Sequence, residues 1–459
     1  MEIDPILKEI AGVFASHNKS VFLVGGAVRD ILRGVESHDF DLATDAVPEE
    51  VIAMFRVVIP TGIKHGTVTV RYRGLSIEVT TFRTEADYLD GRHPSRVAYA
   101  ATIEADLGRR DFTMNAVAAP LPGGKPLVDP FNGIGDIKRG VICSVGEARE
   151  RFSEDGLRPL RALRFVAQLG FSVEEKTLAA IKPCLEITAK VSLERIRDEL
   201  DKIIATPKPS GAFLLMEKTG LLELVLPELA ACRGVEQKGL HRFDVLDHSL
   251  LACDFAARRD ESLLVRLAAL FHDIGKPSAR ALSDDGVWTF YQHEKTSATL
   301  CRALMTRLHY SGAMINDVTH LIGEHMFHYE DIWTNAAVRR FIQRVGVEHL
   351  DALYRLRLAD ASGITGREVP ADYLAGLVSR VDAALAQSAA LSLKDLALTG
   401  HDLMAIGIKP GRLIGIILNE LLETVLDDPE LNTREKLLEI AGKLNQRYAP
   451  QEGVIKELL

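Results

Sequence analysis

Apolar runs of strand length recur along the first third of the chain. They are VFLVGG, TVTVRYRG and LSIEVTTF, at residues 21–26, 67–74 and 75–82, and helical stretches and turns rich in glycine and proline accompany them. From about residue 146 this pattern fades, and apolar residues recur at helical spacing in stretches such as residues 158–171 and 193–204. The pattern predicts an α/β module followed by a mainly helical remainder.

The helical remainder is interrupted twice. RGVEQKGLHRF breaks the pattern near residue 235, and SGITGREVP breaks it near residue 365. A chain of 459 residues is long for a single core, so several units are expected. We expect four parts, and their bounds are residues 1–145, 146–235, 236–365 and 366–459.

Composition restricts the class of protein. The formal net charge of -9 argues against a general nucleic-acid coat, although it permits local basic patches. No apolar run has the length of a membrane span, and MEIDPILKEI does not resemble a signal peptide. The five cysteines are scattered and form no CxxC pair, which fits a reducing compartment. We expect a cytoplasmic protein that does not enter a membrane.

A glycine pair follows the first apolar run. Gly25 and Gly26 stand between VFLV and a helix with a polar face. Glycine lets the backbone approach a ligand closely, and a helix N-terminus offers free N–H groups, which suits an anion. The stretch is neither a Walker loop nor a dinucleotide fingerprint, because the residues that complete those motifs are missing. An ordinary turn from strand to helix is an equally good interpretation of this stretch as an anion-binding turn.

Paired carboxylates follow in SHDFDLAT. Asp39 and Asp41 are two apart in a context that favours a strand, so both side chains project from one face. Adjacent like charges need a cation between them, and oxygen ligands favour magnesium. Glu78 lies on a later strand, where it can flank the pair. Two such ions support a displacement at phosphorus. The alternative is that both residues only end a strand and cap a turn.

GGAVRDILRG together with DFDLAT resembles the first motif of class II tRNA nucleotidyltransferases. These are the CCA-adding enzymes and related bacterial poly(A) polymerases of the DNA polymerase β-like superfamily. TGIKHGTVTV, GRRDFTMNA, DPFNGIGDIKRGVI and RFSEDGLRPLRALRF are similar to later stretches of that family, in order. The resemblance is close over the first 200 residues. It implies an α+β palm-like nucleotidyltransferase domain followed by all-α neck, HD-type and tail domains.

The resemblance also implies roles for individual residues. Asp39 and Asp41 would bind magnesium and act with Glu78 in catalysis. The glycine turn and Arg29 would hold the triphosphate. The full set implied for nucleotide binding is Gly25, Gly26, Arg29, Arg110, Asp111, Asn115, Glu154, Asp155, Arg158, Arg161 and Arg164. Without the resemblance, the RRD sequence that contains Arg110 and Asp111 would be interpreted as a solvated charged turn.

SEDGLRPLRALRF contains a candidate for base selection. Ser153 is expected to cap a helix whose acidic first turn holds Glu154 and Asp155, so that Asp155 and Arg158 share one face. A surface ion pair is the simplest interpretation. Cytosine and adenine, however, each present an amino donor beside a ring-nitrogen acceptor, so a carboxylate and a guanidinium fit both. Uracil and guanine reverse this order. The EDxxR motif of the family matches this segment.

Two features flank this segment. Arg161 and Arg164 continue the same face, and they either meet RNA phosphates or solvate the helix, which we favour. Residues 83–107 are polar and rich in turn formers, so we expect a long loop beside the catalytic face. In the family, such a segment is associated with addition of the terminal A.

A second candidate site lies in the helical remainder. His248, His272, Asp273 and Asp360 can converge from separate helices on a divalent cation, and their order resembles the HD phosphohydrolase superfamily. Lys276 can meet a phosphate. His293 and His325 can complete a second metal position, but a buried packing role or a surface role is favoured for each. Whether such a site is active is left open.

The last helical stretch, residues 398–440, resembles the body and tail with which the family grips tRNA. Lys409 and Arg412, at a KPGR turn, can meet phosphates, and a plain helix-turn-helix core is an equal alternative.

These observations together predict an enzyme that adds C and A from CTP and ATP to the tRNA 3′ end without a nucleic-acid template. Magnesium serves the transfer, and a further divalent metal is expected at the HD site. The alternatives are an A-adding enzyme with a separate CC-adding partner, a poly(A) polymerase, an HD phosphohydrolase acting on RNA ends, and a non-catalytic RNA-binding protein. Protein partners are left open.

Overall fold

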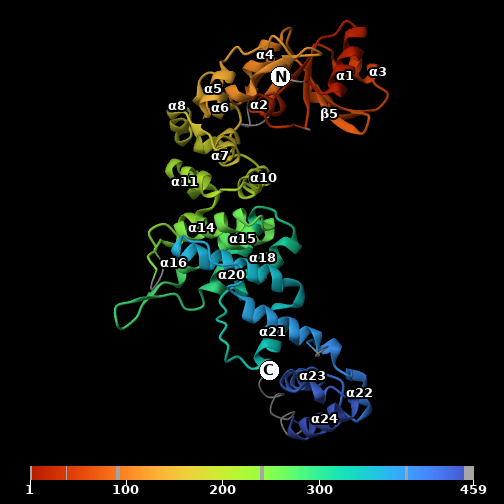
Figure 1. Ribbon diagram of the computed structural model, residues 1–459, viewed down its shortest axis with the longest axis vertical. Helices are drawn as coiled ribbons and strands as arrows, with labels where there is room; N and C mark the ends of the chain where they lie inside the picture. The colour runs from red at the N-terminus through yellow and green to blue at the C-terminus, as the bar shows by residue number, and fades with distance from the viewer. Residues whose placement is uncertain (1–2, 38, 89–93, 238–241, 388–390, 449–459) are drawn as a thin grey trace. The chain divides into compact units, whose positions relative to one another are not determined.

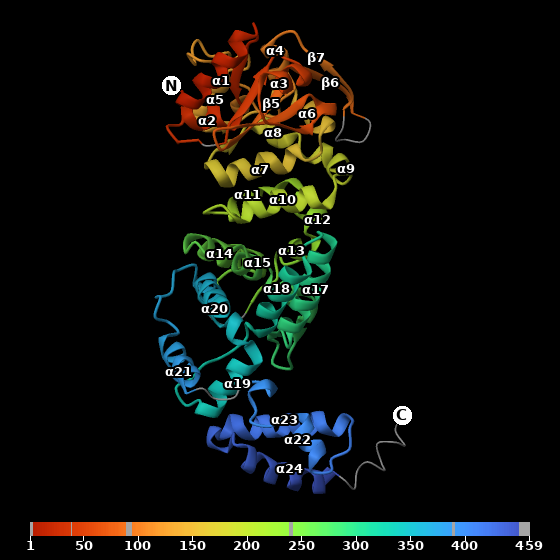
Figure 2. The same ribbon diagram turned by 90° about the vertical axis from the view of Figure 1, so that its right-hand side faces the viewer.

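The computed structural model describes the chain except residues 1–2, 38, 89–93, 238–241, 388–390 and 449–459 (Figures 1 and 2). The chain divides into two compact units. The first comprises residues 1–235, 257–263 and 303–311, and the second comprises residues 236–256, 264–302 and 312–459. The four-part division expected from the sequence stays a prediction. No helix in the described part of the chain has the length and apolar character needed to span a membrane.

The first unit contains a six-stranded sheet with the order β3-β4-β5-β2-β1-β8. The strands are β1 (Val21–Val24), β2 (Asp41–Thr44), β3 (Val58–Gly62), β4 (Thr67–Tyr72), β5 (Leu75–Thr81) and β8 (Ala118–Pro120). The three strands predicted from apolar runs are therefore confirmed. Only β2 and β5 pair in parallel within this sheet, and the other pairs are antiparallel.

Both faces of the sheet are covered. Leu23 and Leu42 belong to a core that includes helix α1 (Pro5–Ser16) and helix α3 (Pro48–Met54). Val24 and Ala43, one residue further along each strand, pack in a second core with helix α4 (Ile103–Gly108). Side chains alternate across a strand, so neighbouring residues supply opposite cores. A polar residue within β2 or β5 therefore has a defined face.

The expectation of a long loop at residues 83–107 is wrong. Strands β6 (Arg83–Tyr88) and β7 (Pro94–Tyr99) form an antiparallel hairpin there, and α4 follows it. Main-chain pairing stabilises these two strands, and the sequence supplies β-branched and aromatic residues on both arms. Polarity and turn formers led to the wrong expectation. Residues 89–93 of the expected loop lie outside the described residues.

Short helices continue the first unit after the sheet. They are α5 (Gly133–Arg139), α6 (Ala148–Glu154), α7 (Arg158–Leu169), α8 (Glu175–Ala179), α9 (Leu185–Thr188), α10 (Leu193–Ile204), α11 (Ser210–Thr219), α12 (Leu221–Val225) and α13 (Pro227–Ala230). Helices α10 and α11 both pack on α7. The short parallel pair β9 (Val141–Ile142) and β10 (Ser172–Val173) lies among them.

The expectation that a helix starts at Ser153 is also wrong. Ser153 and Glu154 belong to the last turn of α6, Asp155 is extended, and α7 begins only at Arg158. Pro159 favours this arrangement, because proline suits the first turn of a helix, where its missing N–H is not needed. Asp155 and Arg158 therefore stand at the ends of two helices and do not share one helix face.

The second unit is mainly helical, as predicted. Its helices are α14 (Val245–Arg258), α15 (Leu263–Phe271), α16 (Lys276–Ala279), α17 (His293–Arg307), α18 (Gly312–Glu324), α19 (Asn335–Val345), α20 (Leu350–Thr365), α21 (Ala375–Ala386), α22 (Gly400–Ala405), α23 (Arg412–Asp427) and α24 (Arg434–Tyr448), and the ends of α14, α15 and α17 extend into the first unit. A short hairpin joins β11 (Ala281–Leu282) to β12 (Trp288–Thr289). The last three helices share an apolar core, and Lys409 and Arg412 are exposed at the turn before α23.

The break between α6 and α7 yields a test of the fold. A Cβ at Gly156 would lie 2.6 Å from the carbonyl oxygen of Ile187, so Gly156→Ala must push the two segments apart. Overpacking of this kind costs about 1–3 kcal/mol. We expect thermal unfolding followed by circular dichroism to show a lower midpoint. Gly211→Ala is the control, because nothing lies within 4 Å of its Cβ position. An unchanged midpoint for Gly156→Ala would contradict the packing described.

Candidate active site

The glycine turn connects β1 to helix α2 (Gly26–Leu32). Gly25 has a φ of +72°, and a Cβ on it would lie 3.3 Å from both Oδ2 of Asp41 and Nη1 of Arg110. Positive φ is unfavourable for other residues, and the two side chains occupy the space that a methyl group needs. Glycine here therefore lets a carboxylate and a guanidinium approach the end of β1.

The predicted carboxylates lie around the first residue of β2. Asp41 begins the strand, and Glu78 in β5 is its direct partner in the parallel pair. Asp39 is exposed and precedes the strand, so the expectation that both aspartates occupy a strand is wrong. Asp41 pairs with Val24, the last residue of β1, so the pairing of β1 with β2 does not extend to Asp39. The negative charge of Asp39 still acts on Asp41.

Asp41 is hard to ionise in this setting. Burial raises its pKa most, and the charges of Glu78 and Asp39 raise it further, from 3.8 to about 6, against a lowering effect of Arg110. A divalent cation would remove this penalty by binding the ionised carboxylates. Every acidic donor here is an oxygen, which fits a hard cation. The residues present therefore fit a divalent metal.

The cleft beside Asp41 has a volume of about 530 Å³. It brings together these predicted site residues: Asp41, Glu78, Arg110, Asp111, Asp155, Arg158 and Arg161. The first two come from the sheet, and the last three come from the α6–α7 break and from α7. Asp41 and Glu78 thus line the same cleft as the candidate base-selecting residues, whereas Asp39 is not part of its lining.

Asp111 is held at the cleft by a chain of hydrogen bonds. Nε and Nη2 of Arg161 donate to its Oδ2 at 2.8 and 2.7 Å, and the amide of Asn115 donates to its Oδ1 at 3.1 Å. Arg29 in turn donates to Asn115 at 3.0 Å. Burial would raise the pKa of Asp111, but Arg161 and Asn115 lower it to about 2. Asp111 is 8% exposed, so a solvated turn is excluded.

Arg29 and Asn115 contribute to the cleft indirectly, because Arg29 holds Asn115 and Asn115 holds the cleft residue Asp111. Neither belongs to its lining, and Arg29 is buried, with its guanidinium bonded to Asp30 as well as to Asn115. Gly25, Gly26, Glu154 and Arg164 are likewise absent from the lining. The structure therefore separates the predicted set into residues that face the cleft and residues that hold them.

Asp155 and Arg158 both face the cleft but do not pair with each other. Asp155 accepts a hydrogen bond from the backbone of Leu157 at 3.0 Å and one from Arg195 at 2.9 Å. Arg158 donates to Glu154 at 2.6 Å and to two backbone carbonyls, at 2.8 and 2.9 Å. The simple ion pair considered from the sequence is therefore not formed.

The preference for Arg161 and Arg164 as solvating residues is wrong. Arg161 binds Asp111, and the Nε of Arg164 lies 2.8 Å from Oε2 of the buried Glu199. The guanidinium carbon of Arg164 also lies 4.3 Å from the ring centre of Phe165. Both side chains therefore connect α7 to other parts of the first unit, because the expected solvent face of α7 is covered by α10.

Some residues that line the cleft were not predicted. His65, Arg83, Arg109 and Arg195 belong to this group. Arg195 lies in α10, 40 residues from its partner Asp155, and the helical pattern there indicates only which residues are buried. Such a long-range ion pair leaves no local signal in one sequence.

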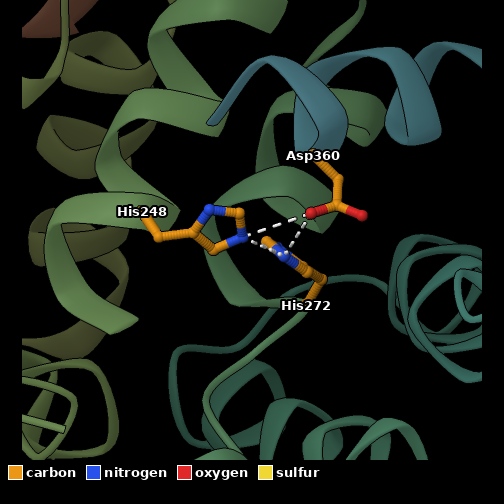
Figure 3. Close-up of side chains that lie close together, drawn as sticks. All are labelled: His248, His272 and Asp360. Carbon is orange, nitrogen blue, oxygen red and sulfur yellow. Dashed lines mark hydrogen bonds and ion pairs between the residues drawn. The ribbon is translucent and has the colours of Figure 1, made fainter. Parts of the chain in front are cut away.

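The histidines of the second unit form a separate cluster (Figure 3). His248 in α14, His272 just after α15 and Asp360 in α20 point toward one another. Nε2 of His248 lies 3.0 Å from Nε2 of His272 and 3.2 Å from Oδ1 of Asp360. The distance from Nε2 of His272 to Oδ1 of Asp360 is 3.5 Å. These three ligand atoms are spaced so that one metal ion can bind all of them.

Asp273 extends the cluster toward two further histidines. Its Oδ1 lies 3.2 Å from Nε2 of His293 and 3.9 Å from Nε2 of His325, and its Oδ2 lies 3.2 Å from Nε2 of His272. His272, Asp273 and His325 form a second group that can hold a metal ion. The surface role considered for His293 and His325 is wrong, since both are buried.

The buried imidazoles and carboxylates of this cluster shift the pKa values of its histidines. Burial disfavours the charged imidazole, but Asp273 and Asp360 raise the pKa of His272 to about 10. Burial and the charge of His272 lower the pKa of His325 to about 3. Nε2 of His293 and Oδ1 of Asp273 are buried without a hydrogen bond in the described part of the chain. Imidazole and carboxylate donors with such atoms fit a divalent metal.

Three family models match the chain. Residues 21–143 match the poly A polymerase head domain, residues 170–233 match the probable RNA and SrmB-binding site of polymerase A, and residues 245–361 match the HD domain. The first match contains the sheet and its carboxylates, and the third contains the histidine cluster.

Similarity to known proteins extends over nearly the whole chain. The CCA-adding enzyme of Lactobacillus johnsonii is 34% identical over 437 residues, which cover 95% of this chain and 95% of that enzyme. That of Lactobacillus delbrueckii subsp. bulgaricus is 36% identical over 419 residues, or 91% and 92%. The crystal structure of the Bacillus stearothermophilus CCA-adding enzyme in complex with CTP is 27% identical and has a TM-score of 0.72, with 98% of this chain and 100% of that chain covered. The protein belongs to the family of CCA-adding enzymes and is a nucleotidyltransferase.

Proposed function

We propose that the protein adds C and A from CTP and ATP to the 3′ end of tRNA, without a nucleic-acid template and with release of pyrophosphate. The observation that carries the proposal is the single cleft that Asp41 and Glu78 share with Asp155 and Arg158. The relatives described above carry the name CCA-adding enzyme, which favours full CCA addition over A addition alone or poly(A) synthesis.

Asp39 and Asp41 would hold Mg²⁺, with Glu78 beside them. When bound, the metal lowers the pKa of the RNA 3′ hydroxyl and neutralises charge on the departing pyrophosphate. Arg110, which lines the cleft near Asp41, would meet the phosphates of the nucleotide. Asp111 and Arg161, which both line the cleft, hold each other in place through their hydrogen bonds. The 3′ hydroxyl attacks the α-phosphorus directly, so no protein side chain becomes covalently modified.

Base selection would depend on hydrogen-bonding capacity that the protein itself leaves unused. Three of the five N–H groups of Arg158 bind protein oxygens, so two are left for a ring nitrogen of the base. Each carboxylate oxygen of Asp155 accepts one protein hydrogen bond and has a second lone pair for an exocyclic amino group. Arg195 would position Asp155. Uracil and guanine would leave buried groups unpaired.

The proposal is tested with tRNA transcripts that end before CCA, after CC, or with complete CCA, each with labelled CTP or ATP. We expect C addition to the first, A addition to the second and none to the third. Asp41→Asn should lower incorporation at least about a hundredfold, because a neutral amide binds a cation poorly. Glu49→Gln, exposed on α3, is the control. Addition of A to complete tRNA would instead indicate a poly(A) polymerase.

Asp155→Ala tests base selection. Loss of the acceptor for the amino group should lower the ratio of CTP to UTP incorporation about tenfold or more. Arg158→Ala is less informative, since it would also leave two backbone carbonyls without their donor. Glu150→Ala, at an exposed position of α6, serves as the control and should keep the wild-type ratio. If Asp155→Ala keeps that ratio too, the base-reading role is wrong.

We also propose a second activity, a metal-dependent phosphohydrolase at the histidine cluster. The specific observation is the convergence of His248, His272, Asp273 and Asp360, extended by two buried histidines. A bound divalent cation would activate a water molecule there. Lys276, whose Nζ lies 2.6 Å from Oδ2 of Asp273, would face the charge of a phosphate ester.

Removal of one ligand tests this second activity. Asp273→Asn should lose the divalent metal that the wild type retains after dialysis, as measured by atomic emission, and should lose hydrolysis of p-nitrophenyl phosphate. Asp284→Asn, at an exposed turn, should retain both. Addition of C and A to tRNA should be unchanged in either variant. Phosphatase activity that survives Asp273→Asn would place that chemistry elsewhere.

A further inference from the structure

A pocket of about 350 Å³ opens beside the histidine cluster. Lys276 and His293 line it, and both contact Asp273 of the cluster, at 2.6 and 3.2 Å. The rest of its lining is mainly apolar and includes Trp288, Phe290, Tyr291 and Met326. One pocket therefore joins the polar cluster to an aromatic surface.

The aromatic surface is unusually open. Tyr291 is 82% exposed and Met326 is 57% exposed. The guanidinium carbon of Arg280 lies 3.7 Å from the ring centre of Trp288, so a cation covers part of the indole. The carbonyl oxygen of Phe290 lies 2.9 Å from Nδ1 of His293, which ties this segment to the cluster. Exposed aromatic faces of this kind suit stacking with another planar ring.

The cluster end of the pocket suits an anion or a metal-bound group. Nε2 of His293 and Oδ1 of Asp273 are both buried, and neither makes a hydrogen bond in the described ranges. Lys276 is only 7% exposed, and its ammonium group also contacts Gln237 at 2.5 Å. These two buried atoms lie 3.2 Å apart without a hydrogen bond between them, and a ligand that binds either atom at this end of the pocket would satisfy its polar group.

We propose that this pocket binds the base of a nucleoside phosphate whose phosphoryl group faces the histidine cluster. The inference rests on the phosphohydrolase activity proposed above and assigns its base-binding surface. A nucleoside phosphate carries a planar base, for Tyr291 and Phe290, and an anionic group, for Lys276 and the cluster. A free nucleotide and the terminal nucleotide of an RNA share this chemistry. An apolar peptide lacks the anionic end.

The hydrolysis requires no reactant besides water. A bond forms between phosphorus and the oxygen of water, and the bond between phosphorus and the sugar oxygen breaks. One proton of the water passes to the leaving sugar oxygen, and the other stays on the phosphate. The products are a nucleoside or RNA hydroxyl and inorganic phosphate.

Tryptophan fluorescence tests the binding part directly. Both tryptophans of the chain, Trp288 and Trp333, lie in the second unit, so quenching reports a ligand there and not in the cleft of the first unit. The metal-free, full-length protein is titrated with adenosine 3′-monophosphate and with ribose 5-phosphate. We expect saturable quenching by the nucleotide alone.

Tyr291→Ala should weaken nucleotide affinity at least about fivefold, as expected for lost stacking. Tyr373→Ala is the matched control, since Tyr373 is 51% exposed in the same unit and lies outside this pocket. That variant should stay within about twofold of the wild type. Equal affinity in Tyr291→Ala and wild type, or equal quenching by ribose 5-phosphate, would overturn the proposal.

Hydrolysis by the Mn²⁺-loaded protein separates this inference from the activity on which it rests. In Tyr291→Ala, KM should rise for adenosine 3′-monophosphate and for a short RNA with a 3′-phosphate, and the substrate with the lower wild-type KM identifies the source. Tyr291-dependent binding without hydrolysis would support the base-binding surface and refute the phosphohydrolase. Equal hydrolysis of ribose 5-phosphate and the nucleotide would support the phosphohydrolase and refute the base-binding surface.

Discussion

Charged side chains buried close together are the constraint on which both candidate sites depend. The parallel pairing of β2 with β5 fixes Glu78 opposite Asp41, and the approach of Asp39 adds a third negative charge. The sheet maintains this arrangement because residues on either side of Asp41 along the strands pack into apolar cores. A divalent cation bound by these carboxylates would neutralise their charge, and the nucleotidyl transfer proposed for the cleft would use the same cation.

The cleft also shows how α helices complete a site that begins on a sheet. The α6–α7 break places Asp155 and Arg158 at facing helix ends, and the ion pair with Arg195 adds a contribution from α10. Arg161 and Asn115 hold Asp111 between them. Ionised groups whose hydrogen bonds are mostly made by the protein keep a fixed orientation, and the few remaining donors and acceptors can then discriminate between bases.

The histidine cluster solves a similar electrostatic problem with different donors. Two buried carboxylates sit among imidazoles, and in the absence of a metal they hold a proton on His272. Imidazole and carboxylate together accept a wider range of divalent metals than oxygen ligands alone. The two proposed activities would therefore use separate metals, one at the carboxylates of the first unit and one at the histidine cluster of the second.

The sequence by itself determined three of the six strands of the sheet, the strand-glycine-helix turn and many of the residues that gather in both sites, because these depend on local pattern or on motif. It could not determine that residues 83–107 form a hairpin and a helix, or that α7 begins at Arg158. It also missed Arg195 and the ion pair of Arg164 with Glu199. These features depend on contacts between residues far apart in the chain, such as Asp155 with Arg195. Only the tertiary structure decides which charged side chain meets another charge and which meets water.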